Sequence, residues 1–328
     1  MRNMFIIIII LAALTGCQGS TPPNTEPVRK LTLSYTIQPQ CTLIHVAQAK
    51  GYFVAEKLDI QAQIHTFGKA ALQSMLDGKA DLATAAETPI MFSILKGEKI
   101  FVLANIEASA TNNAIVARKD AGITKAGDLK GKRVGFTRGT TSDFFMSSLL
   151  TANGLTRKDV RQIGLKPEEM RDAIMSERVD AVSTWNYPLT QISNELGANA
   201  TVFFDKEIYT ETFNLVVQQE FARKNPELVK RLLRALIKAE DFTRDNPEEA
   251  QGIVSKATQT DKALVRSVWS NFGYQLVLDQ ILLITLEDET RWAMSNKLTD
   301  RADMPDYLSF IYFDGLKAVK PKAIKMKQ

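Results

Sequence analysis

The stretch VGFTRGTTSDFFM, residues 134–146, joins a short apolar strand to a polar turn and then to the start of a helix. The first backbone N–H groups of a helix have no partner inside the helix and carry a partial positive charge. Thr140, Thr141 or Ser142 can cap this helix, while its remaining N–H groups face a bound group. The stretch therefore predicts a place where the backbone holds a ligand.

On both sides of this stretch, strand-like and helix-like segments alternate, which predicts parallel α/β sheets. Strands are expected at residues 31–36, 59–67, 80–85, 100–106, 114–118, 132–136, 179–185 and 201–204. Helices are expected at residues 42–53, 69–79, 141–155, 168–178 and 187–197, from Thr88-Pro89, and after the Asn-Pro pairs at 225 and 246. The alternation of strands and helices starts again after residue 117. The chain is also longer than a domain with a single hydrophobic core usually is. We expect one lobe from residues 30–116 plus 209–328, and a second lobe from residues 117–208.

The first residues predict export. Arg2 precedes an apolar run at residues 4–14, which is too short for a bilayer span and is typical of a signal peptide at residues 1–16. The following LTGC resembles the bacterial lipobox, in which Cys17 becomes the lipidated first residue. An ordinary signal peptide with an incidental cysteine is the alternative. Residues 17–29 are polar and rich in Pro, Ser and Thr, and they predict a flexible tether.

Composition excludes several classes of function. The formal net charge is +4, and removal of the signal peptide with Arg2 would leave about +3, too little to predict nucleic-acid binding. With Cys17 lipidated, Cys41 has no disulfide partner, and only two histidines are present for a metal site. Neither a phosphate-binding loop nor a Ser-His-Asp set is evident, so we expect no catalytic residue, metal or cofactor.

Six segments, in this order and spacing, carry a family resemblance. They are AQAKGYFVAEKLDI, LDGKADLATAAETP, ITKAGDLKGKRVGFTRGTTSDFF, ANGLTRKDV, ERVDAVSTWNYP, and NPELVKRLLRALIKA with DNPEEA. Between about residues 31 and 256 the chain resembles the solute-binding proteins of bacterial ABC importers for nitrate, aliphatic sulfonates, taurine and thiamine precursors. The chain departs from the usual family pattern at Arg178, where relatives usually have glycine, and at Glu87 and Asp143, which are not general to the family.

The resemblance implies a type II periplasmic-binding fold, in which two α/β lobes are joined by two crossing strands and hold a solute between them. It implies a monomer on the periplasmic or cell-surface side of a bacterial membrane, anchored through Cys17, with an ABC permease as partner. A periplasmic sensor that signals to a membrane receptor is an alternative. A pyrimidine-synthase-like enzyme of the same superfamily is the other, but the cysteine-rich CCCFC motif of that enzyme is absent.

Solutes in such folds lie beyond the carboxyl ends of the strands. The strand ends and the resemblance together give these candidate ligand-binding residues: Gln38, Pro39, Gly68, Glu87, Thr88, Arg138, Thr140, Thr141, Ser142, Asp143, Trp185, Asn186 and Thr210. Tyr209 and Glu211 lie beside Thr210 at the expected second crossing.

Four of these residues have two interpretations. Asp143 either complements the helix dipole or accepts a hydrogen bond from an amine or amidine of the solute, and Glu87 is either a surface acid or faces the cleft. Trp185 either stacks on a planar solute or fills the core, and Arg138 either pairs with an anion or faces solvent. If both acids face the cleft, a zwitterion or an aminopyrimidine fits better than a simple oxyanion, because buried unpaired carboxylates are costly.

Overall fold

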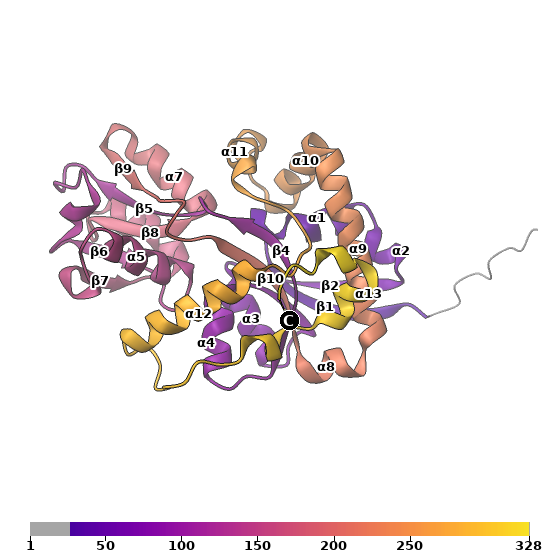
Figure 1. The fold of residues 1–328 in the computed structure, drawn as a ribbon. Coiled ribbons are helices and arrows are strands. Elements are labelled where there is room, and N and C mark those ends of the chain that lie inside the picture. The colour runs from indigo at the N-terminus through magenta and orange to yellow at the C-terminus, as the bar shows by residue number, and fades with distance from the viewer. Residues whose placement is uncertain (1–26, 328) are drawn as a thin grey trace, which may run out of the picture.

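The chain forms two α/β lobes that lie side by side, each built on a five-stranded sheet (Figure 1). The computed structural model describes residues 27–327. The predicted signal peptide, the lipidation site at Cys17 and nearly all of the predicted tether lie outside the described residues. Along the described part, none of the helices combines the length and the apolar composition needed to cross a bilayer.

The first lobe contains a sheet with the strand order β2-β1-β3-β10-β4. Its strands are β1 (Arg29–Thr36), β2 (Leu58–His65), β3 (Leu82–Ala86), β4 (Ile100–Ser109) and β10 (Glu211–Gln218). The strands β1, β2 and β3 are parallel, whereas β10 runs antiparallel to both β3 and β4. The sheet of the first lobe is therefore completed by a strand that follows the whole second lobe in sequence.

The second lobe repeats this arrangement with the order β7-β6-β8-β5-β9. Its strands are β5 (Asn113–Arg118), β6 (Arg133–Phe136), β7 (Arg161–Gly164), β8 (Ala181–Trp185) and β9 (Ala200–Phe203). Here β5 is the antiparallel strand, paired with β8 and β9. The prediction of purely parallel sheets is wrong for one strand in each lobe. That strand arrives directly from the other lobe and so enters its sheet from the opposite end.

Helices cover the sheets. They are α1 (Thr42–Ala49), α2 (Tyr52–Ala55), α3 (Gly68–Leu76), α4 (Glu87–Leu95), α5 (Thr141–Ala152), α6 (Met170–Met175), α7 (Asn186–Leu196), α8 (Gln219–Lys224), α9 (Pro226–Asp245), α10 (Pro247–Thr258), α11 (Lys262–Val268), α12 (Gln280–Ser295) and α13 (Phe313–Val319). The helices α5, α6 and α7 pack on the second sheet, and α1 packs against α9 and α10 in the first lobe. The late helix α12 packs on α4, so residues after β10 return to the first lobe (Figure 1).

Two asparagines join consecutive helices in an unexpected way. Pro226 and Pro247 begin α9 and α10 as the Asn-Pro pairs predict. The Asn225 and Asn246 side chains, however, do not accept hydrogen bonds from these helices. Their Nδ2 groups donate backwards, to the carbonyls of Phe221 at 3.0 Å and Phe242 at 3.3 Å. Each asparagine also ends the preceding helix, and its side chain satisfies a carbonyl there.

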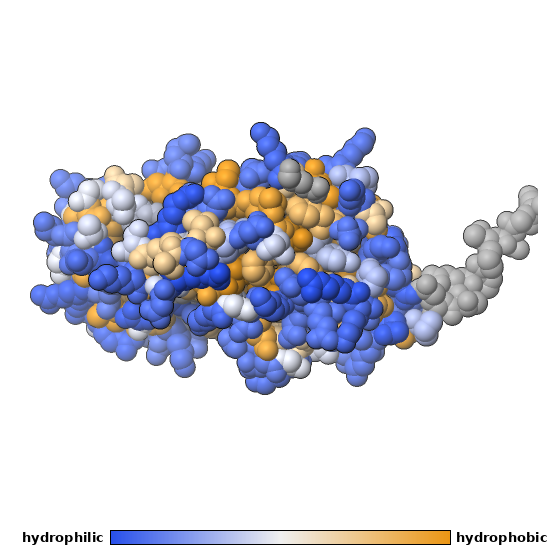
Figure 2. All heavy atoms as spheres, turned by 60° about the horizontal axis from the view of Figure 1, so that its bottom comes forward, coloured by the Kyte–Doolittle hydropathy of each residue, from blue (hydrophilic) through white to orange (hydrophobic). Residues whose placement is uncertain are grey.

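The cores of both lobes are apolar. Leu33, Leu215 and Val216 are fully buried in the first sheet, and Val182 and Ile192 are fully buried in the second lobe. Figure 2 shows one outer face, where hydrophilic residues cover most of the two ends and hydrophobic residues gather towards the middle. One apolar cluster contains residues of both lobes, and a smaller cluster lies in the second lobe alone.

Leu215→Ala tests the contribution of β10 to the first lobe. Because Leu215 is fully buried in a strand between two others, the substitution should lower the free energy of unfolding by about 2–5 kcal/mol. Urea unfolding followed by circular dichroism measures it. The control is Val54→Ala, because Val54 is 72% exposed and its loss should change stability by less than about 0.5 kcal/mol. Equal effects of the two substitutions would contradict a structural role for β10.

Candidate ligand-binding cleft

A small cavity lies between the lobes, where polar and aromatic side chains of both sheets meet. Its lining consists of Gln38, Gln40, Phe67, Gly68, Lys69, Ala86, Pro89, Thr140, Thr141, Trp185, Glu211 and Phe213. The cavity measures about 30 Å³, which is enough for little more than water. The cavity is partly open to solvent, and residues of both lobes line it.

Residues of the first lobe reach the cavity from the ends of its strands. Gln38 and Gln40 follow β1, while Gly68 and Lys69 follow β2 and begin α3. Gly68 is needed there for space, because a Cβ atom on it would lie 3.1 Å from Cα of Ala85 and 3.2 Å from the Phe213 ring. The site thus occupies the carboxyl ends of parallel strands, as the rule for open α/β sheets predicts.

The second lobe contributes the first turn of α5. Thr140 precedes the helix and Thr141 begins it, and both line the cavity. None of the three candidate hydroxyls caps the helix. The Thr140 hydroxyl donates to the carbonyl of Thr137 at 2.8 Å. The Ser142 hydroxyl accepts from the Thr137 N–H at 3.1 Å and donates to the Ser183 carbonyl at 2.8 Å, so it fixes α5 to β8.

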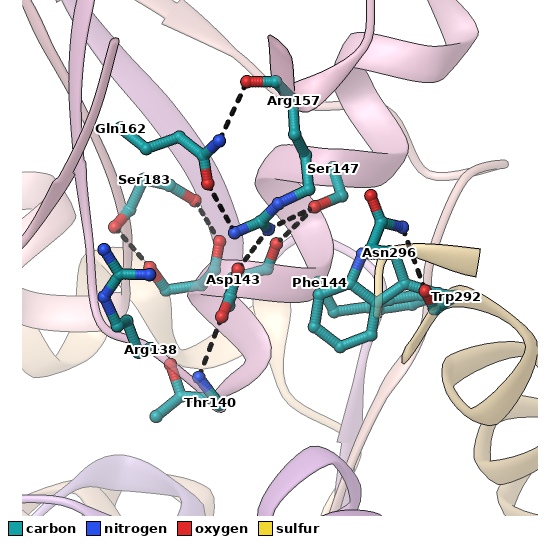
Figure 3. Close-up of polar contacts among 12 residues, drawn as sticks. Arg138, Thr140, Asp143, Phe144, Ser147, Arg157, Gln162, Ser183, Trp292 and Asn296 are labelled. Carbon is teal, nitrogen blue, oxygen red and sulfur yellow. Dashed lines mark hydrogen bonds and ion pairs between the residues drawn. The ribbon is translucent and has the colours of Figure 1, made fainter. Parts of the chain in front are cut away.

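Asp143 is held inside the second lobe (Figure 3). Its Oδ1 accepts from the buried Arg157 guanidinium, and its Oδ2 accepts from the Gly139 N–H at 2.9 Å. Arg157 also donates to the Ser147 hydroxyl at 2.8 Å and to the Gln162 amide oxygen at 2.6 Å. Asp143 and Arg138 line a groove of about 250 Å³ beside the cavity and not the cavity itself. Both carboxylate oxygens of Asp143 are therefore already used within the protein.

Glu87 is also satisfied by the protein. It is fully buried, so the interpretation as a surface acid is wrong. Its carboxylate accepts from the Tyr209 hydroxyl, from the Thr212 N–H at 2.7 Å and from the Thr212 hydroxyl at 2.9 Å. The neighbouring Thr88 hydroxyl donates to Glu289. Glu87 and Thr88 thus belong to a buried network of the first lobe, behind the cavity.

Glu211 is the acid that lines the cavity. It begins β10, is only 1% exposed, and accepts from Gln40 at 3.3 Å, from Asn112 at 2.9 Å and from Asn113 at 2.5 Å. Burial raises the pKa of Glu211, while hydrogen bonds from Asn113, Asn112, Gln40 and Thr141 act to lower it. The Glu211 carboxylate therefore accepts hydrogen bonds from Gln40 of the first lobe, from Asn112 in the crossing between β4 and β5, and from Asn113 of the second lobe.

Direct contacts hold the lobes together around the cavity. The Asn186 amide, in the second lobe, donates to the side-chain oxygens of Gln40 at 3.2 Å and Gln38 at 3.4 Å. The Lys69 ammonium donates to the Arg138 carbonyl at 2.8 Å. These contacts link the segments that follow β1 and β2 in the first lobe to the second lobe. A movement of one lobe relative to the other would therefore also change the shape of the cavity.

Aromatic rings form a second contact between the lobes, away from the cavity. The Phe144 ring of α5 meets Tyr209 and Trp292 of the first lobe edge to face, at centroid distances of 5.2 Å and 5.4 Å. Figure 3 shows the Trp292 ring beside Phe144, with the Arg157 guanidinium nearby. The distance from Arg157 Cζ to the Trp292 ring is 5.9 Å. Such pairs stabilise an interface beyond the area that they bury.

The structure brings some of the predicted site residues together and leaves others apart. Those that line the cavity are Gln38, Gly68, Thr140, Thr141 and Trp185. Those that do not line it are Pro39, Glu87, Thr88, Arg138, Ser142, Asp143, Asn186 and Thr210. Lining residues that the candidate set omits include Gln40, Phe67, Lys69 and Phe213. Phe67 and Lys69 flank Gly68, so the strand-end signal that selects Gly68 could also have found them.

Four carboxyl groups of the first lobe are at most 1% exposed: Glu87, Glu107, Glu211 and Glu289. Burial raises the pKa of each of them, and it raises that of Glu87 to about 8. Both oxygens of Glu107 lack a hydrogen-bond partner among the described residues. In residues 27–327 no group of acids, histidines and cysteine has the arrangement of a metal site. A raised pKa favours the protonated carboxyl, which can donate a hydrogen bond as well as accept one.

Glu107→Gln should stabilise the protein increasingly as the pH rises. Folded Glu107 keeps a proton that the unfolded chain releases above about pH 4.5, so wild-type stability falls with pH until the pKa of the folded state is passed. Burial lowers the pKa of His45 to about 4, which gives the opposite slope below pH 6.5. Urea unfolding between pH 6.5 and 8, where the slope from His45 is absent, should therefore show the gain from Glu107→Gln growing as the pH rises. Parallel wild-type and variant curves would contradict it.

Comparison with known proteins places this geometry among binding proteins. The family profile described as NMT1/THI5 like matches residues 38–250. A Brucella abortus protein named only as a binding protein is 28% identical over 280 residues, which cover 83% of this chain and 82% of the relative. The formylaminopyrimidine-binding protein of Halalkalibacterium halodurans is 24% identical over 275 residues, covering 80% and 81% of the two chains.

Solved structures share the two-lobed fold. The periplasmic aliphatic sulphonate binding protein SsuA of Escherichia coli superposes with a TM-score of 0.74 at 18% identity, covering 88% of this chain and 92% of that one. The desulfurization enzyme DSZB superposes with a TM-score of 0.57 at 18% identity, covering 85% and 97%. The fold is therefore that of periplasmic binding proteins, with two α/β lobes and a cleft between them. Since an enzyme shares it, the fold alone does not decide between binding and catalysis.

Proposed function

Because the chain belongs to the NMT1/THI5-like family, we propose that it is an extracytoplasmic, lipid-anchored solute-binding protein that delivers a small polar solute to an ABC permease. The observation that carries this proposal is the cavity at the strand ends, which is lined by residues of both lobes. Such a cavity can take up a solute and release it without a chemical step. The solute classes that we consider are sulfonates, taurine-like compounds and aminopyrimidines.

In this proposal the solute binds between open lobes and then favours their closure. Gln38 and Gly68 would contact it from the first lobe, and Thr140, Thr141 and Trp185 from the second. A ligand shifts an open–closed equilibrium only through contacts that it makes in one state and not in the other. Because the lining comes from both lobes, a solute makes the full set of contacts only in the closed state. A permease can then distinguish loaded from empty protein by the shape of the closed form.

Solute binding should raise the thermal stability of the full chain purified in detergent. A solute present at about one hundred times its dissociation constant should add about 2.7 kcal/mol to the free energy of unfolding. Taurine, ethanesulfonate, nitrate and aminopyrimidines would be tested by thermal shift, and the best of them by calorimetry. If none of these or other small polar solutes raises the melting temperature, the proposal fails.

Trp185→Ala should weaken the binding of the best solute by about tenfold, since it removes an aromatic wall of the cavity. Trp269→Ala is the matched control, because Trp269 lies in a short helix after α11 and does not line the cavity. Calorimetry on both variants measures the effect. Equal losses in both would contradict a role of Trp185 in the site.

Anchoring through Cys17 has a separate test. Cys17→Ser should move the protein from the membrane fraction to the soluble exported fraction, because it removes the thiol that would carry the lipid. Fractionation of expressing bacteria, with blotting for the protein, measures the distribution. The variant should keep its solute affinity, since the described lobes begin beyond this residue. A Cys17→Ser protein that remains in the membrane fraction would contradict lipidation at this position.

A further inference from the structure

We propose that the first lobe carries a second small-molecule site, in a groove between α1 and α10, and that this site takes a small aromatic acid with a hydroxyl group. The groove measures about 500 Å³ and shares no lining residue with the cavity between the lobes. The site is therefore separate from the cleft, and it goes beyond the proposed function. Its lining combines an unused hydrogen-bond acceptor, an unused hydroxyl group and an unused cation.

The groove lies where the end of β1 and the helix α1 face α10, and α1 and α10 pack side by side (Figure 1). Its lining includes Tyr35 of β1, His45 and Gln48 of α1, and Ile253, Lys256 and Ala257 of α10. Tyr35 and His45 are only 7% and 4% exposed, so they form the floor. Gln48, Lys256 and Ala257 are exposed and form the rim. A ligand in the groove would therefore contact polar groups at both depths.

His45 supplies the unused acceptor. Burial lowers the pKa of His45 to about 4, against a hydrogen bond to the Gln38 backbone that acts to raise it. The imidazole is therefore neutral near pH 7, with one nitrogen that donates and one that accepts. A hydrogen bond that favours the protonated ring is one that the ring donates, so the nitrogen that faces Gln38 carries the proton. The other nitrogen, Nε2, has no partner among the described residues. Because a buried acceptor without a donor is costly, the ligand should bring an O–H or N–H group to it.

Tyr35 and Lys256 supply two unused donors. Burial raises the pKa of Tyr35 to about 12, so its hydroxyl group keeps its proton and can donate it to a hydrogen bond. Neither this hydroxyl group nor the Lys256 ammonium bonds to another side chain or carbonyl within the described part of the chain. A carboxylate accepts hydrogen bonds from both kinds of donor and is attracted by the cation. The ligand should therefore carry an acid group as well as a hydroxyl group.

The remaining walls favour a flat, apolar body. The Tyr35 and His45 rings meet edge to face, with their centroids 5.6 Å apart. Ile253 and Ala257 line the groove with aliphatic groups from the side of α10. Aromatic rings prefer such edge and face contacts over contact with water. A hydroxylated aromatic acid thus has a donor for His45, an acceptor for Tyr35 and Lys256, and a ring that fits between the apolar walls.

Three probes test the inference on the full chain in detergent at pH 7 by calorimetry. They are 4-hydroxybenzoate, 4-methylbenzoate, which has nearly the same shape without the O–H donor, and 4-hydroxyacetophenone, in which a neutral acetyl group replaces the carboxylate. The hydroxy acid should bind at least about tenfold more tightly than either of the other two. Absence of saturable binding of 4-hydroxybenzoate, or equally tight binding of one of the other probes, overturns the inference.

Lys256→Gln removes the cation of the rim with little change of shape. It should weaken the binding of 4-hydroxybenzoate by about tenfold and leave that of 4-hydroxyacetophenone unchanged. Lys158→Gln is the matched control, because Lys158 is an exposed lysine of the second lobe that does not line the groove, and it should leave both affinities unchanged. An unchanged affinity for 4-hydroxybenzoate in Lys256→Gln overturns the inference.

A further variant distinguishes the groove from the cleft. Trp185→Ala alters a wall of the cavity and none of the groove, so it should leave the affinity for 4-hydroxybenzoate unchanged. Loss of 4-hydroxybenzoate binding in Trp185→Ala would place the probe in the cleft and overturn the inference. Failure of the inference leaves the proposed function intact, because the groove and the cavity have no lining residue in common.

Discussion

The two crossings of the chain between the sheets are the constraint on which the rest of the structure depends. Each sheet is completed by one antiparallel strand, β5 or β10, that arrives directly from the other lobe. Asn113 begins β5 and Glu211 begins β10, so both residues lie at the junction. The Asn113 Nδ2 group donates a hydrogen bond to Glu211 Oε2 there at 2.5 Å. The crossings fix the junction, and one apolar cluster continues through it from the first lobe into the second. The cavity forms at the one place where both sheets present their strand ends.

The sequence predicts the local elements well because each of them leaves a local pattern. The alternation in residues 31–36 and the left-handed Gly51 after α1, with φ of 69°, are properties of neighbouring residues. Strand direction is different, since an apolar strand such as β5 has the same pattern whichever way it runs. The direction of β10 depends on where the chain leaves the second lobe. Only the topology of the family, carried by the resemblance, contains that information.

The candidate site was harder to predict because the roles of acids depend on distant partners. Nothing near Glu87 in sequence indicates that Tyr209 and Thr212 satisfy it. Asp143 likewise differs from an ordinary first-turn acid only through Arg157, which lies fourteen residues later and is itself buried. Gly68 and Trp185 could be predicted from the sequence, because both lie at the ends of predicted strands. A glycine at such a place also allows another segment of the chain to approach its backbone closely. A buried charge is stabilised by the donors that the fold places around it. Those donors are distant in sequence, so a single sequence does not show them.

Asp143, in the first turn of α5, and Glu211, at the start of β10, belong to different lobes. Asp143 stays with α5, because its bonds to Gly139 and Arg157 lie within the second lobe. Glu211 belongs to the sheet of the first lobe but accepts from Asn113 of the second. Opening the lobes would therefore leave Asp143 in place and loosen the contacts of Glu211. Since a carboxylate that loses buried donors gains water in an open cleft, the cost of opening is small, and a solute that contacts both lobes changes that balance in favour of the closed state.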